Sequence, residues 1–134
     1  MNKITGQIAA IECNRHMSLV DVAVGDDIFT ATLLETSETA AYLKVGSNVS
    51  LLFKETEVAL AKNLSGLISL RNRFSVTVVN IKRGDILSAV ELDYAGTLLV
   101  SVITTRAVDR LQLAIGDQAE ALVKANEIAL MGES

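Results

Sequence analysis

The sequence predicts an all-β protein made of two tandem five-stranded β-barrels, each with one short helix. Three features of the chain predict this fold class. The sequence repeats itself at an offset of 70 residues without a gap, and apolar and polar residues alternate through most of each copy. Once per copy, the alternation gives way to a helical period. With 134 residues, half of them hydrophobic, the chain is long enough to bury a core.

The repeat extends over nearly the whole chain. It matches Asn2 with Asn72 near the start of each copy and Gly46 with Gly116 further on. The stretch "LKVGSNVSLLFKETEVAL" is accordingly a version of "LQLAIGDQAEALVKANEIAL". Small and polar residues in "AKNLSGLISL" separate the copies, so the sequence predicts one domain at residues 1–63 and a second at residues 64–134.

Each copy reads as the same series of elements. A first hairpin is expected from "GQIAAIEC" and "SLVDVAV", and its counterpart from "SVTVVNIK" and "SAVELDY". A third strand follows in "DIFTATLL" or "TLLVSVIT", then a short helix in "TSETAAYL" or "TRAVDRLQL", ending before a glycine. The last two strands are "NVSLLFK" with "EVALA", and "QAEALVK" with "EIALM". This count and order suit a small barrel of the oligonucleotide/oligosaccharide-binding (OB) type.

Composition limits the compartment and the partners. No apolar run approaches the roughly 18 residues of a membrane-spanning helix, and the N-terminus does not resemble a signal peptide, so we expect a cytoplasmic protein without a membrane partner. Cys13 is the single cysteine, which excludes an internal disulfide. Acidic residues outnumber basic ones by 16 to 12, so the chain has no general attraction for nucleic acid.

Polar residues with hydrogen-bond donors recur at the ends of the predicted elements of the second copy. Ser69 and Arg71 precede its first strand, Thr104 and Thr105 stand where its third strand becomes a helix, and Lys124 ends its fourth strand. We expect these strand ends and the helix start to gather at one end of the barrel. The backbone N–H groups of the first helical turn would add donors there, from Thr105, Arg106, Ala107 and Val108.

A set made only of donors favours a small tetrahedral dianion. Arg71 offers a planar fork of N–H groups, Lys124 a point charge, and the hydroxyls of Ser69 and Thr104 neutral donors. Selectivity among oxyanions would then depend on the size of the enclosed sphere more than on charge. The alternative, in which Ser69 to Asn72 is a solvated connection between domains, remains open.

These residues resemble a known family. "SLRN" is similar to the Ser-Ala-Arg-Asn opening of the molybdenum-pterin-binding (Mop) domain. The stretch "VITTRAVDRLQLAIGDQAEALVKANEI" resembles the family's Val-Thr-x-x-Ser-x-x-x-Leu-x-Leu-x-x-Gly segment ending in Val-Lys-Ala. Two such units in tandem resemble the di-Mop molbindins, and the resemblance is stronger in residues 64–131 than in residues 1–60. It implies OB-type barrels, and binding of molybdate or tungstate at interfaces between Mop units, without an organic cofactor. It also implies a homo-oligomer, a trimer.

The resemblance implies a set of oxyanion-binding residues and some departures from it. In the first unit, Leu34 replaces the threonine and Met1 the arginine, and the family serine of the second unit is Ala107. The implied contacts come from Ser69, Arg71, Asn72, Thr104, Thr105 and Lys124, from the backbone at Ala107 and Val108, and from the matching Ser37, Glu38 and Lys54 of the first unit. Each unit is thus half-equipped, as sites shared between unlike units would require.

The resemblance allows three roles: storage or homeostasis as a free-standing molbindin, the sensing half of a transcription regulator, or the accessory domain of a transporter ATPase. We expect no enzyme, because no nucleophile has an adjacent base. A metal site is not expected either, since Cys13, His16, Asp26 and Asp27 lack an ordered ligand pattern. An OB-type nucleic-acid-binding module is a further alternative, which would need exposed aromatic residues in a basic groove.

Overall fold

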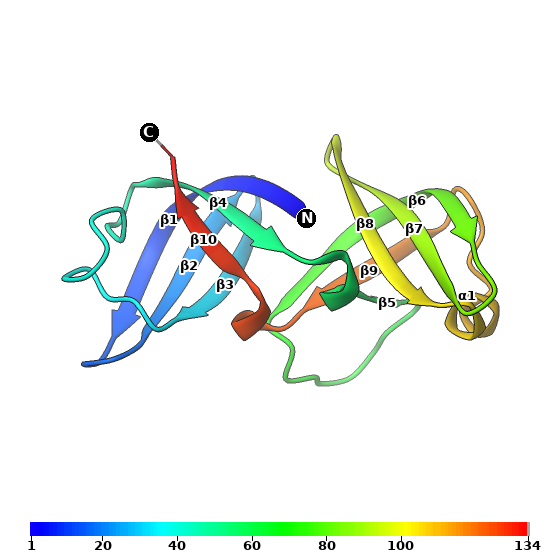
Figure 1. The fold of residues 1–134 in the computed structure, drawn as a ribbon, viewed down its shortest axis with the longest axis horizontal. Helices are drawn as coiled ribbons and strands as arrows, with labels where there is room; N and C mark the ends of the chain where they lie inside the picture. The colour runs from blue at the N-terminus through cyan, green and yellow to red at the C-terminus, as the bar shows by residue number, and fades with distance from the viewer. Residues whose placement is uncertain (134) are drawn as a thin grey trace.

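The computed structural model describes residues 1–133, which form two five-stranded antiparallel sheets side by side (Figure 1). The all-β class and the tandem arrangement are therefore confirmed. The first sheet has the order β10-β4-β1-β2-β3, with β10 (Ala129–Gly132), β4 (Asn48–Phe53), β1 (Asn2–Cys13), β2 (Ser18–Val24) and β3 (Asp27–Leu33). The second has the order β5-β9-β6-β7-β8, with β5 (Ala59–Ala61), β9 (Gln118–Val123), β6 (Asn72–Arg83), β7 (Leu87–Tyr94) and β8 (Thr97–Thr104).

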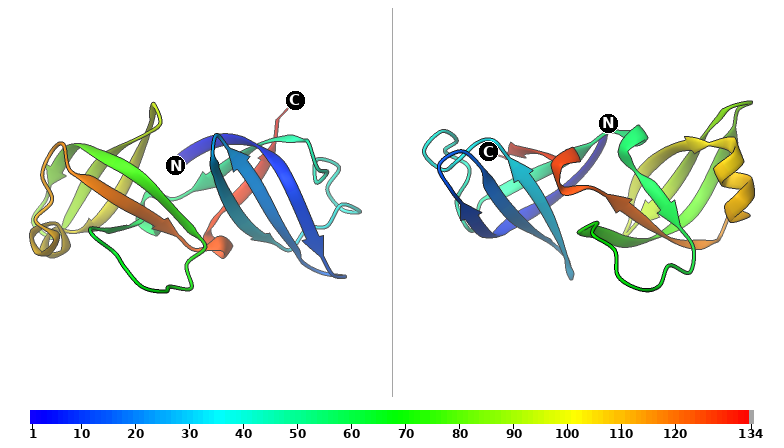
Figure 2. Two further views of the ribbon diagram at one scale, coloured as in Figure 1. Left: turned by 180° about the vertical axis from the view of Figure 1, so that it is seen from behind. Right: turned by 90° about the horizontal axis from the view of Figure 1, so that it is seen from below.

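The two repeats exchange their last strands. Strand β5 closes the first repeat in sequence, yet it pairs with β9 of the second, with Leu60 opposite Ala121. Strand β10 closes the second repeat and pairs with β4 of the first, with Leu130 opposite Leu51. Figure 1 and both views in Figure 2 show β10 leaving its own repeat to lie along the other sheet. Each sheet therefore needs both repeats, whereas the domain boundary between residues 63 and 64 stays a prediction about the sequence.

Aromatic rings fill part of the contact between the two sheets. Phe29 of β3 lies 4.9 Å, between ring centroids, from Phe74 of β6 and 5.9 Å from Tyr94 of β7. All three side chains belong to one buried apolar cluster that continues through both sheets. Edge-to-face and tilted rings at these separations add to the hydrophobic stabilisation of the contact. The two sheets consequently share one core.

Two asparagine side chains reinforce this contact by hydrogen bonds to the neighbouring sheet. The Asn72 amide oxygen accepts from the Thr30 N–H at 2.6 Å, and its amide nitrogen donates to the Thr30 carbonyl at 2.8 Å. In the other repeat, Asn2 does the same with both backbone groups of Val100, at 2.8 Å each. Thr30 and Val100 lie on β3 and β8, the outer strands of the two sheets. The amide side chains thus satisfy backbone groups that an edge strand leaves unpaired.

Only one of the two expected helices forms in residues 1–133. Helix α1 (Thr105–Leu111) follows β8, whereas residues 36–44 form turns. Short 3-10 helices follow β4 and β9, at Glu55–Glu57 and Ala125–Glu127. Thr104 caps α1, since its hydroxyl oxygen accepts from the Ala107 N–H at 3.1 Å, while its counterpart Leu34 has no capping oxygen. The prediction of a helix in each unit is wrong for the first repeat. No helix of the described residues is long and apolar enough to cross a membrane.

Candidate anion-binding residues

Two cationic residues stand opposite each other at the start of the second sheet. The register pairs Asn72 with Val123, so Arg71, just before β6, stands opposite Lys124, just after β9. Both side chains are exposed, and neither forms an ion pair or side-chain hydrogen bond within residues 1–133. Ser69 is exposed two residues earlier. Three of the predicted anion-binding residues are therefore exposed and adjoin the start of β6 or the end of β9, and we call them the junction group: Ser69, Arg71 and Lys124.

Asn72 lies at the same strand end, but its side chain is hydrogen-bonded to the protein backbone. Its side chain is buried, with 1% of its surface exposed. Besides its two bonds to Thr30, the amide nitrogen donates to the Val123 carbonyl at 3.0 Å. Both amide hydrogens and the amide oxygen therefore have backbone partners. The structure places Asn72 beneath the junction group, where it holds the strand end.

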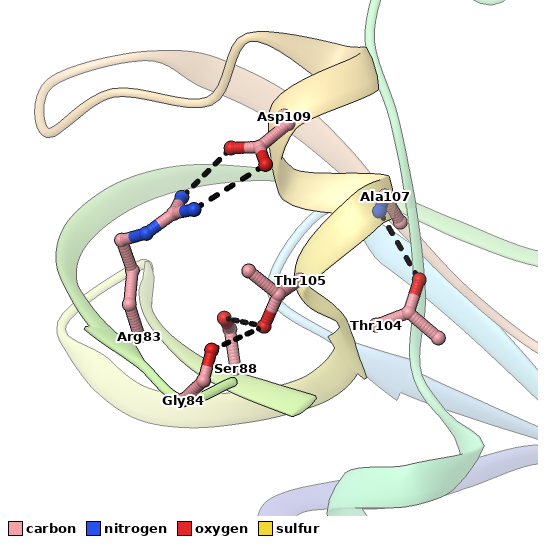
Figure 3. A network of polar contacts seen from close by, with 7 residues as sticks. All are labelled: Arg83, Gly84, Ser88, Thr104, Thr105, Ala107 and Asp109. Carbon is pink, nitrogen blue, oxygen red and sulfur yellow. Dashed lines mark hydrogen bonds and ion pairs between the residues drawn. The ribbon is translucent and has the colours of Figure 1, made fainter. Parts of the chain in front are cut away.

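A second group lies around the start of α1, and we call it the helix group: Thr104, Thr105, Ala107 and Val108. Figure 3 shows the first three of these with their neighbours. The Thr105 hydroxyl donates to the Gly84 carbonyl and lies 2.8 Å from the Ser88 hydroxyl, and its backbone N–H donates to the Ile86 carbonyl. Thr105 and Val108 are buried, and the Ala107 N–H is taken by Thr104. Two of the four backbone N–H groups expected to be free thus have partners. Thr104 itself is exposed and its hydroxyl proton points to no protein acceptor among the described residues.

An arginine–aspartate pair that was not predicted from the sequence links α1 to the end of β6. The Arg83 guanidinium donates to both carboxylate oxygens of Asp109, at 2.8 and 3.3 Å (Figure 3). These charge-assisted hydrogen bonds lower the pKa of Asp109 and raise the pKa of Arg83. The two residues are 26 positions apart in the sequence, so no local pattern would reveal the pair.

The junction group and the helix group lie at opposite ends of the second sheet. Because β6, β7 and β8 follow one another as antiparallel neighbours, β8 runs in the same direction as β6. Its end, Thr104, therefore lies near Arg83, far from Asn72. The length of β6 sets this separation at roughly 35 Å. The expectation that the donors gather at one end of a single barrel is wrong, because the number of strand reversals puts the helix at the other end.

The first repeat has different side chains at the positions that correspond to the junction group and the helix group. Lys54 follows β4, is exposed, and stands opposite Met1 at the position that corresponds to Arg71. Ser37 and Glu38 are exposed in the turns that replace the helix. As in the second sheet, the two places lie at opposite ends of the strands. The first repeat therefore has one lysine at the junction and no helix cap at its far end.

The remaining candidates from the sequence do not form a metal-like cluster. Within residues 1–133, no three His, Cys, Asp or Glu residues come together in a way that could hold a metal ion. Asp27 instead accepts a hydrogen bond of 2.6 Å from the Tyr94 hydroxyl across the two sheets. Burial, with a smaller contribution from Asp27, raises the pKa of Tyr94.

The strand order, the tandem repeat and the exposed donors define a tandem small-barrel protein with the layout of a ligand-binding module. The sequence profile of the TOBE domain matches residues 68–130. A probable molybdenum-pterin-binding protein of Haemophilus influenzae is 36% identical over 62 residues, which cover 46% of this chain and 90% of that protein. The chain belongs to the TOBE domain family and carries its tandem Mop arrangement.

Longer relatives and a solved structure match most of the chain. The molybdenum transport protein ModE of Herbaspirillum seropedicae is 34% identical over 127 residues, 92% of this chain and 47% of that protein. The molybdenum import ATP-binding protein ModC of Brucella abortus (strain 2308) is 43% identical over 86 residues, 63% of this chain and 24% of that protein. A structure of the cytoplasmic molybdate-binding protein ModG with molybdate bound superposes with a TM-score of 0.89, at 31% identity, over 96% of this chain and 94% of that one.

Proposed function

We propose that this protein binds molybdate or tungstate reversibly in the cytoplasm, as a molbindin that serves storage or homeostasis of the metal. The observation that carries the proposal is the likeness of fold and sequence, over 96% of the chain, to ModG with molybdate bound. The relatives are named for molybdenum binding or transport. Binding and release of an oxyanion require donors and no bond-making, which suits a chain without a nucleophile–base pair.

The junction group is the proposed core of the tight anion site. A dianion next to Arg71 and Lys124 would gain charge-assisted hydrogen bonds from both, and Ser69 would add a neutral donor. Asn72 would act from below by holding the strand end through its three backbone bonds. The two cations have no competing ion pair within residues 1–133, so neither would have to break a salt bridge on binding.

The helix group would complete sites only between copies of the chain. Thr104, Ala107 and Val108 lie at the opposite end of the sheet from Arg71, so one anion cannot contact both groups of the same repeat. An oligomer in which one copy's helix end meets another copy's junction would bring the donors together. We therefore propose a homo-oligomer, most simply the trimer that the family resemblance implies.

A second candidate role is a regulatory or transport domain. The matches to ModE and ModC cover nearly half and about a quarter of those proteins, so the same tandem unit also occurs within longer chains. In such a chain it would bind the same oxyanion and transmit its presence to a DNA-binding or nucleotide-binding partner domain. Anion binding would be unchanged, and only the consequence of binding would differ.

The nucleic-acid alternative has little support in the structure. Stacking on single-stranded nucleic acid needs exposed aromatic rings, but Phe29, Phe53 and Phe74 are buried and Tyr94 is 5% exposed. Tyr42 is half-buried and hydrogen-bonded to Glu35. The net charge of −4 adds no attraction for phosphates.

Calorimetric titration of the purified protein with molybdate, tungstate, sulfate and phosphate tests the proposal. We expect tight, saturable binding of molybdate and tungstate and at least about tenfold weaker binding of the smaller sulfate and phosphate. Light scattering on the same samples reports the oligomeric state, and a gel shift with single-stranded oligonucleotides tests the alternative. Equal weak binding of all four anions would contradict an oxyanion-selective function, and a monomer that still binds tightly would contradict the shared site.

A further inference from the structure

The far end of the first repeat carries two carboxylates where the second repeat carries the helix group. At the offset of 70 residues, Glu35 corresponds to Thr105 and Glu38 to Val108. Both glutamates are exposed, whereas Thr105 and Val108 are buried. Positions that point into the fold in one repeat therefore display negative charge in the other.

A different hydrogen-bond arrangement keeps the Glu35 carboxylate at the surface. In the second repeat, the hydroxyls of Ser88 and Thr105 pair at 2.8 Å. In the first repeat, the matching Ser18 hydroxyl donates to the backbone carbonyl of Glu35 at 2.6 Å, so this serine no longer needs a side-chain partner. The Glu35 carboxylate accepts instead from the Tyr42 hydroxyl at 3.0 Å.

Tyr42 in turn is positioned by the exchanged strand. Its hydroxyl lies 3.4 Å from the carbonyl of Leu130 in β10. Gly132 of the same strand lies so close that an added Cβ atom would be 2.9 Å from the Tyr42 Cβ atom. Strand β10 therefore holds Tyr42 against the turn, and Tyr42 holds the Glu35 carboxylate in place.

The two ends also differ in the sign of their charge. Residues 34–46 carry Glu35, Glu38 and Lys44, for a net charge of −1, whereas residues 104–116 carry Arg106, Asp109 and Arg110, for a net charge of +1. Asp109 is neutralised by Arg83. Neither Glu35 nor Glu38 pairs with a cation within the described part of the chain.

We propose that Glu35 and Glu38 make the far end of the first repeat repel dianions, so that the two repeats offer non-equivalent oxyanion sites. A dianion brought to this turn would face two carboxylates and no capped helix, and Coulomb repulsion would lower its affinity there. Glu38, which the family resemblance placed among the anion contacts, would therefore oppose the anion, and both glutamates are determinants of how many tight sites a chain can hold. This inference rests on the proposed oxyanion-binding function.

The test replaces both carboxylates by amides of the same shape and titrates the protein with molybdate. In Glu35→Gln with Glu38→Gln, the weaker class of sites should gain at least about tenfold in affinity, or the number of measurable sites per chain should rise. The matched control, Asp26→Asn with Asp93→Asn, removes the same two charges from hairpin turns away from residues 35–38. It should bind like the parent.

Three outcomes would overturn the inference. A double glutamine variant that binds with the parent's stoichiometry and affinities would show that the carboxylates do not oppose the anion. Equal gains in this variant and in the control would assign the effect to overall charge. If the parent and all variants fail to bind molybdate, the proposed function itself is wrong. This outcome can be told from the other two because no titration would then show binding.

Discussion

The far ends of the two repeats begin from the same strands and finish with different structures. Residues 105–111 form a capped helix that Arg83 ties to the sheet through Asp109. Residues 36–44 form turns, in which the Thr39 hydroxyl bonds to both the N–H and the carbonyl of Thr36. Threonine side chains that bond to nearby backbone compete with helix formation. Sheet pairing thus preserves the strands of a repeat, whereas the connections between the strands can diverge.

The junction ends of the two repeats differ in charge but not in framework. Asn2 and Asn72 both bridge to the outer strand of the other sheet, so the support of the strand start is common to both. Above this support the second repeat has Arg71 with Lys124, while the first has Lys54 and no arginine. We therefore expect this common framework to hold two anion sites of unequal strength, which the following variants can separate.

The largest effect is expected from the shared asparagines. Asn72→Ala leaves the backbone N–H and carbonyl of Thr30 without their side-chain partners and removes one hydrogen bond to the Val123 carbonyl, at a cost of about 2–4 kcal/mol in the free energy of unfolding. Asn2→Ala should cost less, about 1–3 kcal/mol, because Asn2 makes only two such bonds, and its partner Val100 is only half-buried. Urea unfolding measures both.

The exposed Asn48, whose side chain has no hydrogen bond among the described residues, provides the control. Asn48→Ala should change the free energy of unfolding by less than about 0.5 kcal/mol. If Asn72→Ala is as mild as this control, the side chain does not bridge the sheets and its role as a ligand gains support.

The next effect separates the two junctions by their affinity for molybdate. Arg71→Ala should remove the tight class of sites, because a dianion loses a charge-assisted hydrogen bond of about 1.5–3 kcal/mol, or tenfold to more than a hundredfold in affinity. Arg71→Lys should restore part of this affinity, since an ammonium lacks the paired donors of a guanidinium. Lys54→Ala should weaken only the less avid class. Calorimetric titration with molybdate measures these affinities, on variants whose fold is intact. An unchanged molybdate affinity in Arg71→Ala would rule out a role of Arg71 in the tight site.

The strands were predictable from the sequence, whereas their partners were only partly so. The alternation in "SVTVVNIK" and "SAVELDY" correctly predicted β6 and β7, because half-buried strands require it. The exchange of β5 and β10 left no signal. Their residues, "EVALA" and "EIALM", are so similar that the sequence of either strand suits either sheet. The sequence therefore does not indicate which sheet each strand joins.

The candidate site shows the same limit. Arg71 and Lys124 were predicted to be neighbours and are, because both adjoin ends of paired strands. Asn72 could not be assigned from sequence, since an asparagine at a strand start can equally contact a ligand or neighbouring backbone. The distance from Arg71 to Thr104 depends on how often the chain reverses direction between them, which local residue patterns do not report.

A smaller effect should follow from the helix cap that distinguishes the far ends. Thr104→Ala removes the acceptor of the Ala107 N–H and should destabilise the protein by about 1 kcal/mol. The matched change Leu34→Ala in the first repeat removes no cap, because Leu34 is 82% exposed and no helix follows. Thermal unfolding measures the loss of stability in each of the two variants relative to the parent. Equal shifts in both variants would show that capping does not account for the difference between the repeats.

The smallest effect is a dependence of stability on alkaline pH that belongs to the first repeat. Burial, followed by the hydrogen bond to Glu35, raises the pKa of Tyr42 to about 12 from 10.0, and the matching residue of the second repeat, Gln112, does not titrate. The folded protein thus holds the phenolic proton more tightly than the unfolded chain. This contribution to stability is complete below pH 10 and is lost as the pH rises through about 12.

Tyr42→Phe should therefore lose less stability than the parent when urea midpoints are compared between pH 8 and pH 11, while Tyr94 contributes the same background to both proteins. Parallel curves for parent and variant would mean that Tyr42 keeps no tighter hold on its proton in the folded state, and would weaken the assignment of Tyr42 as the residue that positions Glu35.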